Sequence, residues 1–277
     1  ILKRDKMSLV NSDWLEKNIN KVKILDCSWH MPNVKRNGYD EYVKEHIPGS
    51  IFFDLDKYSK NNTDLPHMLP DPILWEEIVS SLGISNDEKI VIYDNSDVIS
   101  SCRCWFNFIY FGHNPNLVSV LNGGLKKWKL EGKPITNNYN KILRSNYKSF
   151  DNKNLVKDIN QINHNISEKK FILLDARSKE RFEGKVPDPR KNVRSGSIPN
   201  SLCLPYKEII NNEDNTFKNK DEILKKFMEI IDVKKNNVVF SCGSGVTACV
   251  LALAYSLVNN KYAPTIYDGS WAEYGKI

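Results

Sequence analysis

Short apolar runs alternate with amphipathic stretches along the whole 277-residue chain. The runs at 22–26 and 90–93 do not alternate strictly between apolar and polar residues, which is typical of strands buried on both faces of a sheet. The stretches at 72–82 and 221–231 have apolar residues at helical spacing. Such strands, joined by helices, are typical of a parallel sheet covered by helices. The pattern therefore predicts an α/β protein.

An internal repeat divides the chain into two similar halves. Four landmarks recur in the same order roughly 150 residues later, which is the signature of a duplicated domain. The recurring pairs are 22–26 with 171–175, 47–50 with 198–201, 90–94 with 238–242, and 121–125 with 267–271. We therefore expect two tandem domains at residues 1–138 and 155–277, joined by a polar linker at 139–154.

The turn at 242–245 is the strongest candidate for chemistry. Its sequence, Cys-Gly-Ser-Gly, separates an apolar strand at 238–241 from an apolar helix that begins near Val246. Backbone N–H groups at such a turn and the dipole of the following helix attract an anion. Cys242 is therefore expected to act as a thiolate, which is the reactive form. The alternative is a buried, inert cysteine at the end of a strand.

The spacing around this turn excludes two other anion-binding loops. A P-loop ends in Gly-Lys-Ser/Thr, and no lysine precedes Thr247. A cysteine phosphatase has an arginine six residues after its nucleophile, where this chain has Ala248. A loop that accepts a single sulfur atom remains.

The segment 242–248, Cys-Gly-Ser-Gly-Val-Thr-Ala, resembles the active-site loop of the 3-mercaptopyruvate sulfurtransferases, a branch of the two-domain rhodanese (thiosulfate sulfurtransferase) family. The resemblance implies two tandem rhodanese-like domains, each a mainly parallel sheet flanked by helices. It also implies that only the second domain is catalytic, and Asp94 stands in the first copy where Cys242 stands in the second. Supporting motifs at 26–29, 46–49, 52–56, 67–70 and 267–271 cover nearly all of the chain.

The same resemblance implies a sulfurtransferase that moves sulfur from 3-mercaptopyruvate to a thiol through a persulfide on Cys242, releasing pyruvate. Two alternatives stay open: an enzyme of the same fold that uses thiosulfate with cyanide as acceptor, and a persulfide carrier in tRNA thiolation. Thiosulfate-preferring relatives have basic residues where this loop is neutral, so Gly243 and Ser244 favour mercaptopyruvate.

The roles of further site residues also come from the resemblance. It places Asp56, His67 and Ser244 in a hydrogen-bonded set beside the cysteine, in which a carboxylate orients an imidazole and the imidazole moves a proton. Sequence spacing alone does not show this set. Arginine binds a carboxylate with a planar fork. The substrate-binding residues implied are Arg181, Arg190, Gly243, Gly245, Val246 and Thr247.

The lysine and arginine residues behind the net charge of +6 are scattered, so no direct nucleic-acid binding is expected. No apolar run reaches the roughly 20 residues that span a bilayer. The six cysteines have no zinc-site spacing and are expected to be reduced thiols. We therefore expect no metal, no organic cofactor and no membrane contact.

The expected partners are a small sulfur donor, a thiol acceptor such as thioredoxin, and a sulfur-relay or tRNA-thiolation protein. The expected compartment is the cytoplasm. The alternative is the mitochondrion, if an upstream targeting segment was removed, because the sequence does not start at methionine.

Overall fold

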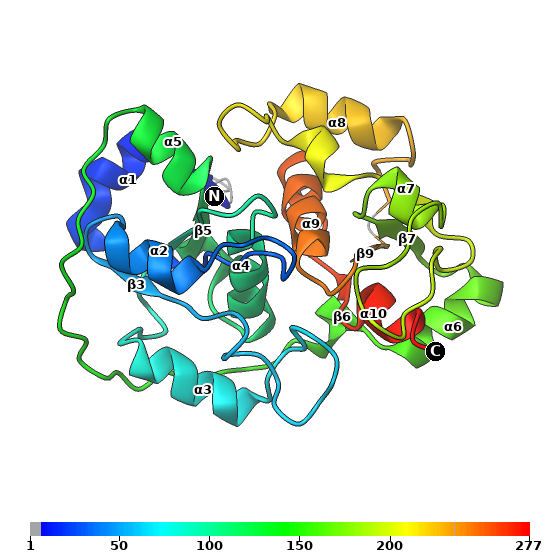
Figure 1. Ribbon diagram of the computed structural model, residues 1–277, viewed down its shortest axis with the longest axis horizontal. Helices are drawn as coiled ribbons and strands as arrows, with labels where there is room; N and C mark the ends of the chain where they lie inside the picture. Colours follow the sequence, from blue (N-terminus) through cyan, green and yellow to red (C-terminus); the bar gives the residue numbers. More distant parts are fainter. Residues whose placement is uncertain (1–6, 236) are drawn as a thin grey trace. The chain divides into compact units, whose positions relative to one another are not determined.

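The computed structural model describes residues 7–235 and 237–277, and its residues form two compact units (Figure 1). Unit 1 runs to Tyr58, resumes at Pro70–Asn152 and includes Glu213–Thr216. Unit 2 comprises Ser59–Leu69, Lys153–Asn212 and Phe217–Ile277. Each half of the sequence therefore contributes a short segment to the other unit. The domain limits expected from the sequence, at 138 and 155, stay a prediction.

Unit 1 is built on a five-stranded sheet with the order β1-β5-β4-β2-β3. All of its strand pairs are parallel. Every residue of the inner strand β4 is buried, which explains why its sequence is apolar without alternation. The strands are β1 (Leu9–Val10), β2 (Lys23–Asp26), β3 (Ser50–Phe52), β4 (Ile90–Tyr93) and β5 (Val118–Leu121).

Two groups of helices cover the sheet of unit 1 (Figure 1). Leu15 of α1 and Trp128 of α5 pack in one cluster with Val91 of β4. Trp75 of α3 meets Phe108 of α4 edge to face, with ring centroids 5.0 Å apart. The helices are α1 (Ser12–Asn18), α2 (Gly38–Lys44), α3 (Pro72–Ser81), α4 (Ser101–Tyr110) and α5 (Gly124–Leu130), with 3₁₀ turns η1 (Ile19–Lys21) and η2 (Pro115–Leu117).

Unit 2 repeats this sheet. Its strand order is β6-β10-β9-β7-β8, which is the order of unit 1 when the strands are matched along the chain. All of these pairs are again parallel. The repeat seen in the sequence is therefore a repeat of the fold. The strands are β6 (Val156–Lys157), β7 (Ile172–Asp175), β8 (Leu202–Cys203), β9 (Val238–Ser241) and β10 (Ile266–Tyr267).

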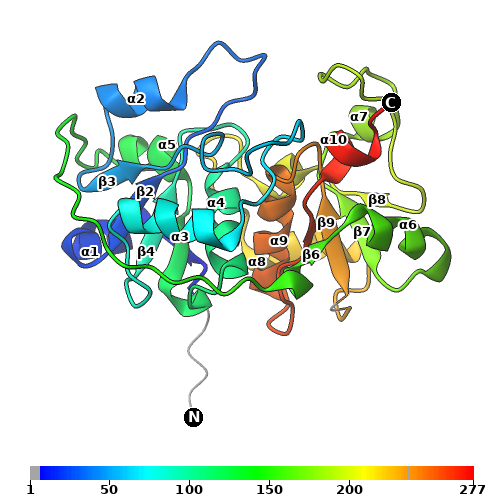
Figure 2. The same ribbon diagram turned by 90° about the horizontal axis from the view of Figure 1, so that it is seen from below.

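In unit 2, helix α9 lies on one side of β9, and α6 and α10 lie on the other (Figure 2). Val239 shares a cluster with Ile162 of α6 and Trp271 of α10. Phe240 meets Tyr255 of α9 with ring centroids 5.9 Å apart. Because adjacent strand residues point to opposite faces, helices cover both faces of this sheet. The helices are α6 (Ile159–Glu168), α7 (Lys179–Phe182), α8 (Lys220–Met228), α9 (Thr247–Val258) and α10 (Ser270–Tyr274), with η3 (Lys153–Leu155) and η4 (Tyr206–Ile209).

The predicted fold class is confirmed, because both units are parallel sheets flanked by helices. The predicted helix at 72–82 is α3, and the one predicted at 221–231 is α8, which ends earlier, at Met228. Within the described residues, no helix has the length and apolar character needed to cross a membrane.

Candidate active site

Cys242 lies directly after β9, in the turn that leads into α9. Ligands of parallel α/β sheets bind at this carboxyl end of the strands. The cysteine is 2% exposed. The N–H of Gly245 donates to its Sγ atom, with 3.1 Å between nitrogen and sulfur. Gly245 has a φ of +76°, which only glycine adopts readily. The glycine thus allows the turn to direct a backbone donor at the sulfur.

A short segment after β10 supports the backbone of this turn. The N–H of Trp271 donates to the carbonyl of Cys242 over 2.9 Å, and the N–H of Ala272 donates to the carbonyl of Gly243 over 2.9 Å. The Oγ of Ser270 accepts the N–H of Cys242 over 3.2 Å and donates to the carbonyl of Tyr267. The carbonyl oxygens of Cys242 and Gly243 therefore both accept hydrogen bonds from α10.

Helix α9 places its N-terminus next to the sulfur. Val246 is buried, and Thr247 is half-buried as the first residue of the helix. The unpaired N–H groups and dipole of a helix N-terminus favour negative charge nearby. Cys249 lies one turn further on, and its Sγ donates to the carbonyl of Gly245 over 3.2 Å. The substrate-binding roles of Gly243, Gly245, Val246 and Thr247 stay predictions.

Arg181 and Arg190 are held together by one carboxylate. Nη2 of Arg181 lies 2.9 Å from Oδ2 of Asp188, and Nη1 of Arg190 lies 3.3 Å from its Oδ1. The Asp188 side chain is 1% exposed, whereas the two arginine side chains are 22% and 23% exposed. Burial raises the pKa of Asp188, but the Arg190 N–H and the two guanidinium groups lower it more, so it lies below its ordinary value. Asp188 is therefore a charged anchor between two cations.

Both guanidinium groups lie against the cysteine turn. A Cβ atom added at Gly243 would be 3.0 Å from Nη1 of Arg190 and 3.2 Å from Nη2 of Arg181. The Nε of Arg181 has no hydrogen-bond partner within the described part of the chain. The structure therefore brings the two predicted arginines together, beside the residue that follows Cys242.

His67 belongs to the first copy of the sequence repeat, but its side chain contacts the same turn. Its Nδ1 lies 3.0 Å from the Oγ of Ser244. Both side chains are buried, at 5% and 4% exposure. The segment that carries the histidine, Ser59–Leu69, belongs to unit 2 together with Ser244. The predicted pairing of these two residues is present in the structure, while their catalytic roles stay a prediction.

Asp56, the third member of the predicted set, belongs to unit 1. Its carboxylate accepts the indole N–H of Trp29 at 3.0 and 3.1 Å. The expected contact between Asp56 and His67 stays a prediction.

Sequence reasoning missed three residues that build this site: Asp188, Asp268 and Ser270. Asp268 is buried and accepts the N–H of Leu69 over 2.9 Å. Asp268 and Ser270 lie in the landmark at 267–271, and Asp188 lies in a Pro-Asp-Pro-Arg run. Each of these residues is a polar residue inside a motif that the sequence analysis noted, and no further sequence pattern marks it as part of the site.

The corresponding turn of unit 1 holds a carboxylate in place of the sulfur. Asp94 follows β4 as Cys242 follows β9. Its Oδ1 accepts the N–H of Ser96 over 2.8 Å, and its Oδ2 accepts the N–H of Ser101 over 3.0 Å. Burial raises the pKa of Asp94, while those hydrogen bonds oppose the shift. The backbone donors of this turn are thus occupied by the chain itself.

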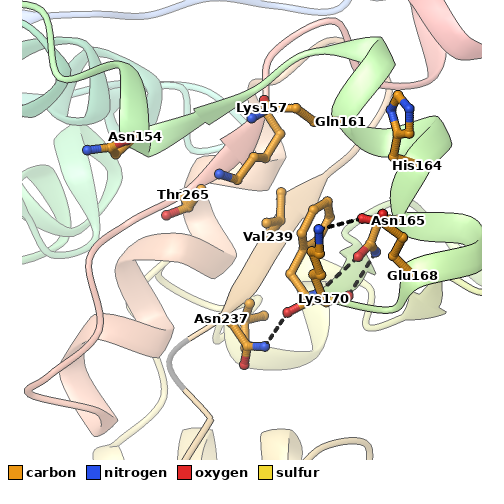
Figure 3. Close-up of a pocket in the computed structure, with 12 residues that line it drawn as sticks. Asn154, Lys157, Gln161, His164, Asn165, Glu168, Lys170, Asn237, Val239 and Thr265 are labelled. Carbon is orange, nitrogen blue, oxygen red and sulfur yellow. Dashed lines mark hydrogen bonds and ion pairs between the residues drawn. The ribbon is translucent and has the colours of Figure 1, made fainter.

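A pocket of about 640 Å³ lies in unit 2 beside the starts of its strands (Figure 3). Residues of α6 form one wall of the pocket, and Phe171 and Val239 contribute apolar surface. Strand starts and strand ends lie at opposite edges of a parallel sheet, so this pocket is separate from the cysteine turn. None of the predicted site residues lines it. In residues 7–235 and 237–277, no group of three or more His, Cys, Asp or Glu residues could hold a metal ion.

The family profile described as Rhodanese-like domain matches residues 11–131 and again 158–276. Thiosulfate/3-mercaptopyruvate sulfurtransferase 1, mitochondrial, of Arabidopsis thaliana is 38% identical over 96% of this chain and 75% of its own length. SseA from Escherichia coli, a crystal structure described with the 3-mercaptopyruvate sulfotransferases, is 30% identical. It superposes with a TM-score of 0.85 over 96% of this chain and 99% of SseA.

A second solved structure is the sub-stoichiometric sulfur transferase subunit of yeast mitochondrial complex I. It is 32% identical and superposes with a TM-score of 0.85, over 96% of this chain and 95% of that subunit.

Proposed function

This chain belongs to the rhodanese family, and from this premise we propose that it is a sulfurtransferase whose Cys242 takes sulfur from 3-mercaptopyruvate. The persulfide on Cys242 then passes its outer sulfur to a thiol acceptor. The same family was inferred from the sequence, and that inference is confirmed.

One observation carries the choice of donor. Two guanidinium groups lie 3.0 to 3.2 Å from the Cβ position of Gly243, next to the nucleophile. A 2-oxo acid presents a carboxylate and a carbonyl oxygen, and arginine binds such oxygens with two parallel donors. The Nε of Arg181 has no hydrogen-bond partner in the described residues and is a donor left over for a ligand. Arg181 and Arg190 would therefore hold the oxo acid with its sulfur towards Cys242.

In the first step, the Cys242 thiolate attacks the sulfur of 3-mercaptopyruvate. A sulfur–sulfur bond forms and the carbon–sulfur bond breaks, with its electron pair leaving on pyruvate enolate. The N–H of Gly245, already on the Sγ atom, and the N-terminus of α9 stabilise the anionic sulfur. Arginine clamping also orients the reacting atoms, which supplies part of the rate.

The enolate must then gain a proton to become pyruvate, and the thiol of the donor must lose one. The Ser244 hydroxyl with the His67 imidazole 3.0 Å away supplies a buried path for that transfer. The net change is one proton moved from the sulfur to a carbon, so that no oxidant or reductant is consumed.

The test is mass spectrometry of the intact protein and its peptides after mixing with 3-mercaptopyruvate. The peptide with Cys242 should gain one sulfur atom, and Cys242→Ser should gain none. Cys203→Ser is the matched control and should gain sulfur like the parent, because burial raises the pKa of Cys203 to about 12 and keeps it a thiol. Sulfur on another cysteine in place of Cys242 would contradict the proposal.

Thiosulfate is the second candidate donor, because the Arabidopsis relative is named for both donors. The two are separated by steady-state kinetics. We expect the larger kcat/KM with 3-mercaptopyruvate, because the segment 242–248 contains no basic residue to bind a dianion. A larger kcat/KM with thiosulfate would reverse the assignment.

Transfer of sulfur to a protein partner is supported by the likeness to a sulfur transferase that is a subunit of yeast complex I. Thioredoxin and a tRNA-thiolation protein are the acceptor classes that fit a protein persulfide. If this chain only relayed sulfur received from another protein, Arg181→Gln with Arg190→Gln would leave transfer unchanged. We expect that double variant to lose mercaptopyruvate turnover. Cytoplasm is the proposed compartment, with the mitochondrion of the Arabidopsis relative as the alternative.

A further inference from the structure

We propose that Asp268 is a positioning residue for His67. Its carboxylate holds the loop that brings the imidazole to Ser244, and it does so through the backbone N–H of Leu69. The inference rests on the proposed function only in that His67 is taken to move a proton there.

The contact joins two segments that are far apart in the sequence. Oδ2 of Asp268 accepts the N–H of Leu69 over 2.9 Å, and the Asp268 residue is 4% exposed. Asp268 comes directly after β10 and two residues before Ser270. The segment that supports the cysteine turn through Ser270 and Trp271 thus also supports the histidine loop. The segment 268–271 therefore supports both the histidine loop and the turn that carries Ser244.

The histidine loop needs such an anchor. His67 has a φ of +61°, a left-handed conformation that is unfavourable for a residue with a Cβ atom. From residue 60 to 64 the loop is exposed, so little apolar burial restrains it. The N–H of Lys60 donates to the carbonyl of Met68 over 2.8 Å and closes the loop on itself. Leu69, two residues from His67, is where the buried carboxylate of Asp268 attaches it to the sheet.

A second tie of the same loop is of a different kind. Asp64 pairs with Lys276, but the two side chains are 72% and 50% exposed. Exposed ion pairs of this type contribute little to stability. Of these two contacts, the buried one with Asp268 is the nearer to the histidine along the chain.

Loss of the anchor has a specific kinetic consequence. Without the carboxylate, the backbone at His67 is free to leave its left-handed conformation, and the imidazole moves away from Ser244. Proton transfer slows, while Arg181 and Arg190 still bind the oxo acid. Asp268→Ala should therefore lower kcat by at least about tenfold, since small displacements of a reacting group have large effects. KM should change by no more than about twofold, because Arg181 and Arg190, which bind the substrate carboxylate, are unchanged.

The experiment is a double-mutant cycle of Asp268→Ala with His67→Ala. If Asp268 acts through His67, the double variant is no slower than His67→Ala, because the group that Asp268 positions is already gone. If the two losses multiply, Asp268 acts through the cysteine turn and the inference is wrong. Asp64→Ala is the matched control in the same loop and should keep the parent's kcat.

Hydrogen exchange gives a readout without turnover. The amides of 59–69 should exchange faster in Asp268→Ala than in the parent or in Asp64→Ala. Unchanged exchange in Asp268→Ala would overturn the inference whatever the activity. Faster exchange in a protein that never forms a persulfide from 3-mercaptopyruvate would leave the positioning role standing and remove the proposed function.

Asp268→Asn replaces Asp268→Ala if the alanine variant does not fold. The amide keeps an oxygen for the Leu69 N–H and removes the charge. Turnover and exchange close to the parent's support an anchor that works by hydrogen bonding. A kcat as low as that of His67→Ala, with slow exchange retained, would show that charge and not loop position matters, and would overturn the inference.

Discussion

The Nδ1 atom of His67 lies 3.0 Å from the Oγ atom of Ser244, although 177 residues separate the two in the chain. The histidine comes from the first sequence copy, yet its loop packs as part of unit 2. The two copies are therefore not equivalent parts of the protein. In the proposed mechanism, the second copy supplies the nucleophile and the arginines, and the first supplies the imidazole that moves the proton.

The side chains of His67 and Ser244 should act together in one proton-transfer step of turnover. His67→Ala and Ser244→Ala should each lower kcat by about a hundredfold, which is typical of losing a general acid–base group. The double variant should be no slower than either single variant, because both side chains act on the same proton. Steady-state turnover of 3-mercaptopyruvate measures this.

The control for this pair is Ser256→Ala, near the other end of α9. Its hydroxyl donates to the carbonyl of Leu253 in the same helix, and the variant should keep the parent's kcat. Two single-variant losses that multiply in the double variant would contradict the shared proton path.

Gly243 should set the space available to the guanidinium groups. The Cβ of Gly243→Ala would lie 3.0 Å from Nη1 of Arg190 and 3.2 Å from Nη2 of Arg181, so these flexible ends must shift. We expect KM for 3-mercaptopyruvate to rise by about tenfold, the usual scale for one displaced contact in a binding pocket. The persulfide should still form on Cys242 at saturating donor.

Gly132→Ala is the matched control for Gly243→Ala. Its added Cβ would meet nothing within 4 Å, although its φ of +65° strains the backbone. It should therefore lower stability and leave KM unchanged. A KM unchanged in Gly243→Ala as well would place the donor elsewhere than on the two arginines.

The sequence predicted the sheets and the cysteine turn because both depend on local patterns. The fully buried strands β4 and β9 are apolar runs, and the turn after β9 is marked by two glycines around Ser244. The duplication predicted that the two halves share one fold, since equal landmarks in equal order predict equal folds.

The contacts between distant segments could not be predicted in this way. No periodicity links His67 to Ser244, and only the resemblance to a family paired them. Asp188 and Asp268 were missed because a buried acid in a polar stretch has the same sequence pattern as an exposed one. What distinguishes them is the partner, a pair of guanidinium groups or a backbone N–H, and that depends on the tertiary fold.

Asp188 should hold the guanidinium groups of Arg181 and Arg190 in place beside the cysteine turn. Asp188→Asn removes the charge shared by Arg181 and Arg190, so we expect KM to rise by about tenfold or more with a smaller change in kcat. The matched control is Glu183→Gln in the same segment, because the Glu183–Lys185 pair is exposed at 44% and 68%. A rise in KM of equal size in both variants would point to the net charge of the segment and not to the anchor.

Because the pKa of Asp188 is lowered in the folded protein, its contribution to the free energy of unfolding depends on pH. Its carboxyl binds a proton more weakly in the folded than in the unfolded chain. The stabilisation is therefore present above the ordinary carboxyl pKa near 4 and is lost as the pH falls through the lower, folded value. Asp188→Asn should remove this acid-side loss, which chemical denaturation below about pH 4 would detect.

Asp26 should make unit 1 less stable as the pH rises towards neutrality. It ends β2, is 1% exposed, and accepts hydrogen bonds from the N–H and hydroxyl of Ser28 at 2.9 and 2.5 Å. Burial raises its pKa to about 7, and the hydrogen bonds from Ser28 only partly oppose the shift. Its counterpart Asp175 has instead a buried partner, Arg177, at 2.7 Å.

Between about pH 4 and pH 7 the folded chain therefore holds one proton on Asp26 that the unfolded chain releases. The free energy of unfolding should fall with rising pH in this window, by up to about 1.4 kcal/mol per pH unit from this group. Asp26→Asn stays neutral and should remove that slope. Chemical denaturation at pH 5, 6 and 7, with hydrogen exchange of the β2 amides to follow unit 1, measures it. The control is Asp13→Asn, whose exposed carboxyl has its pKa lowered by Lys133 and stays charged throughout this window. A slope as steep in Asp26→Asn as in the parent would mean that the Asp26 carboxyl is already ionised in the folded protein across this window.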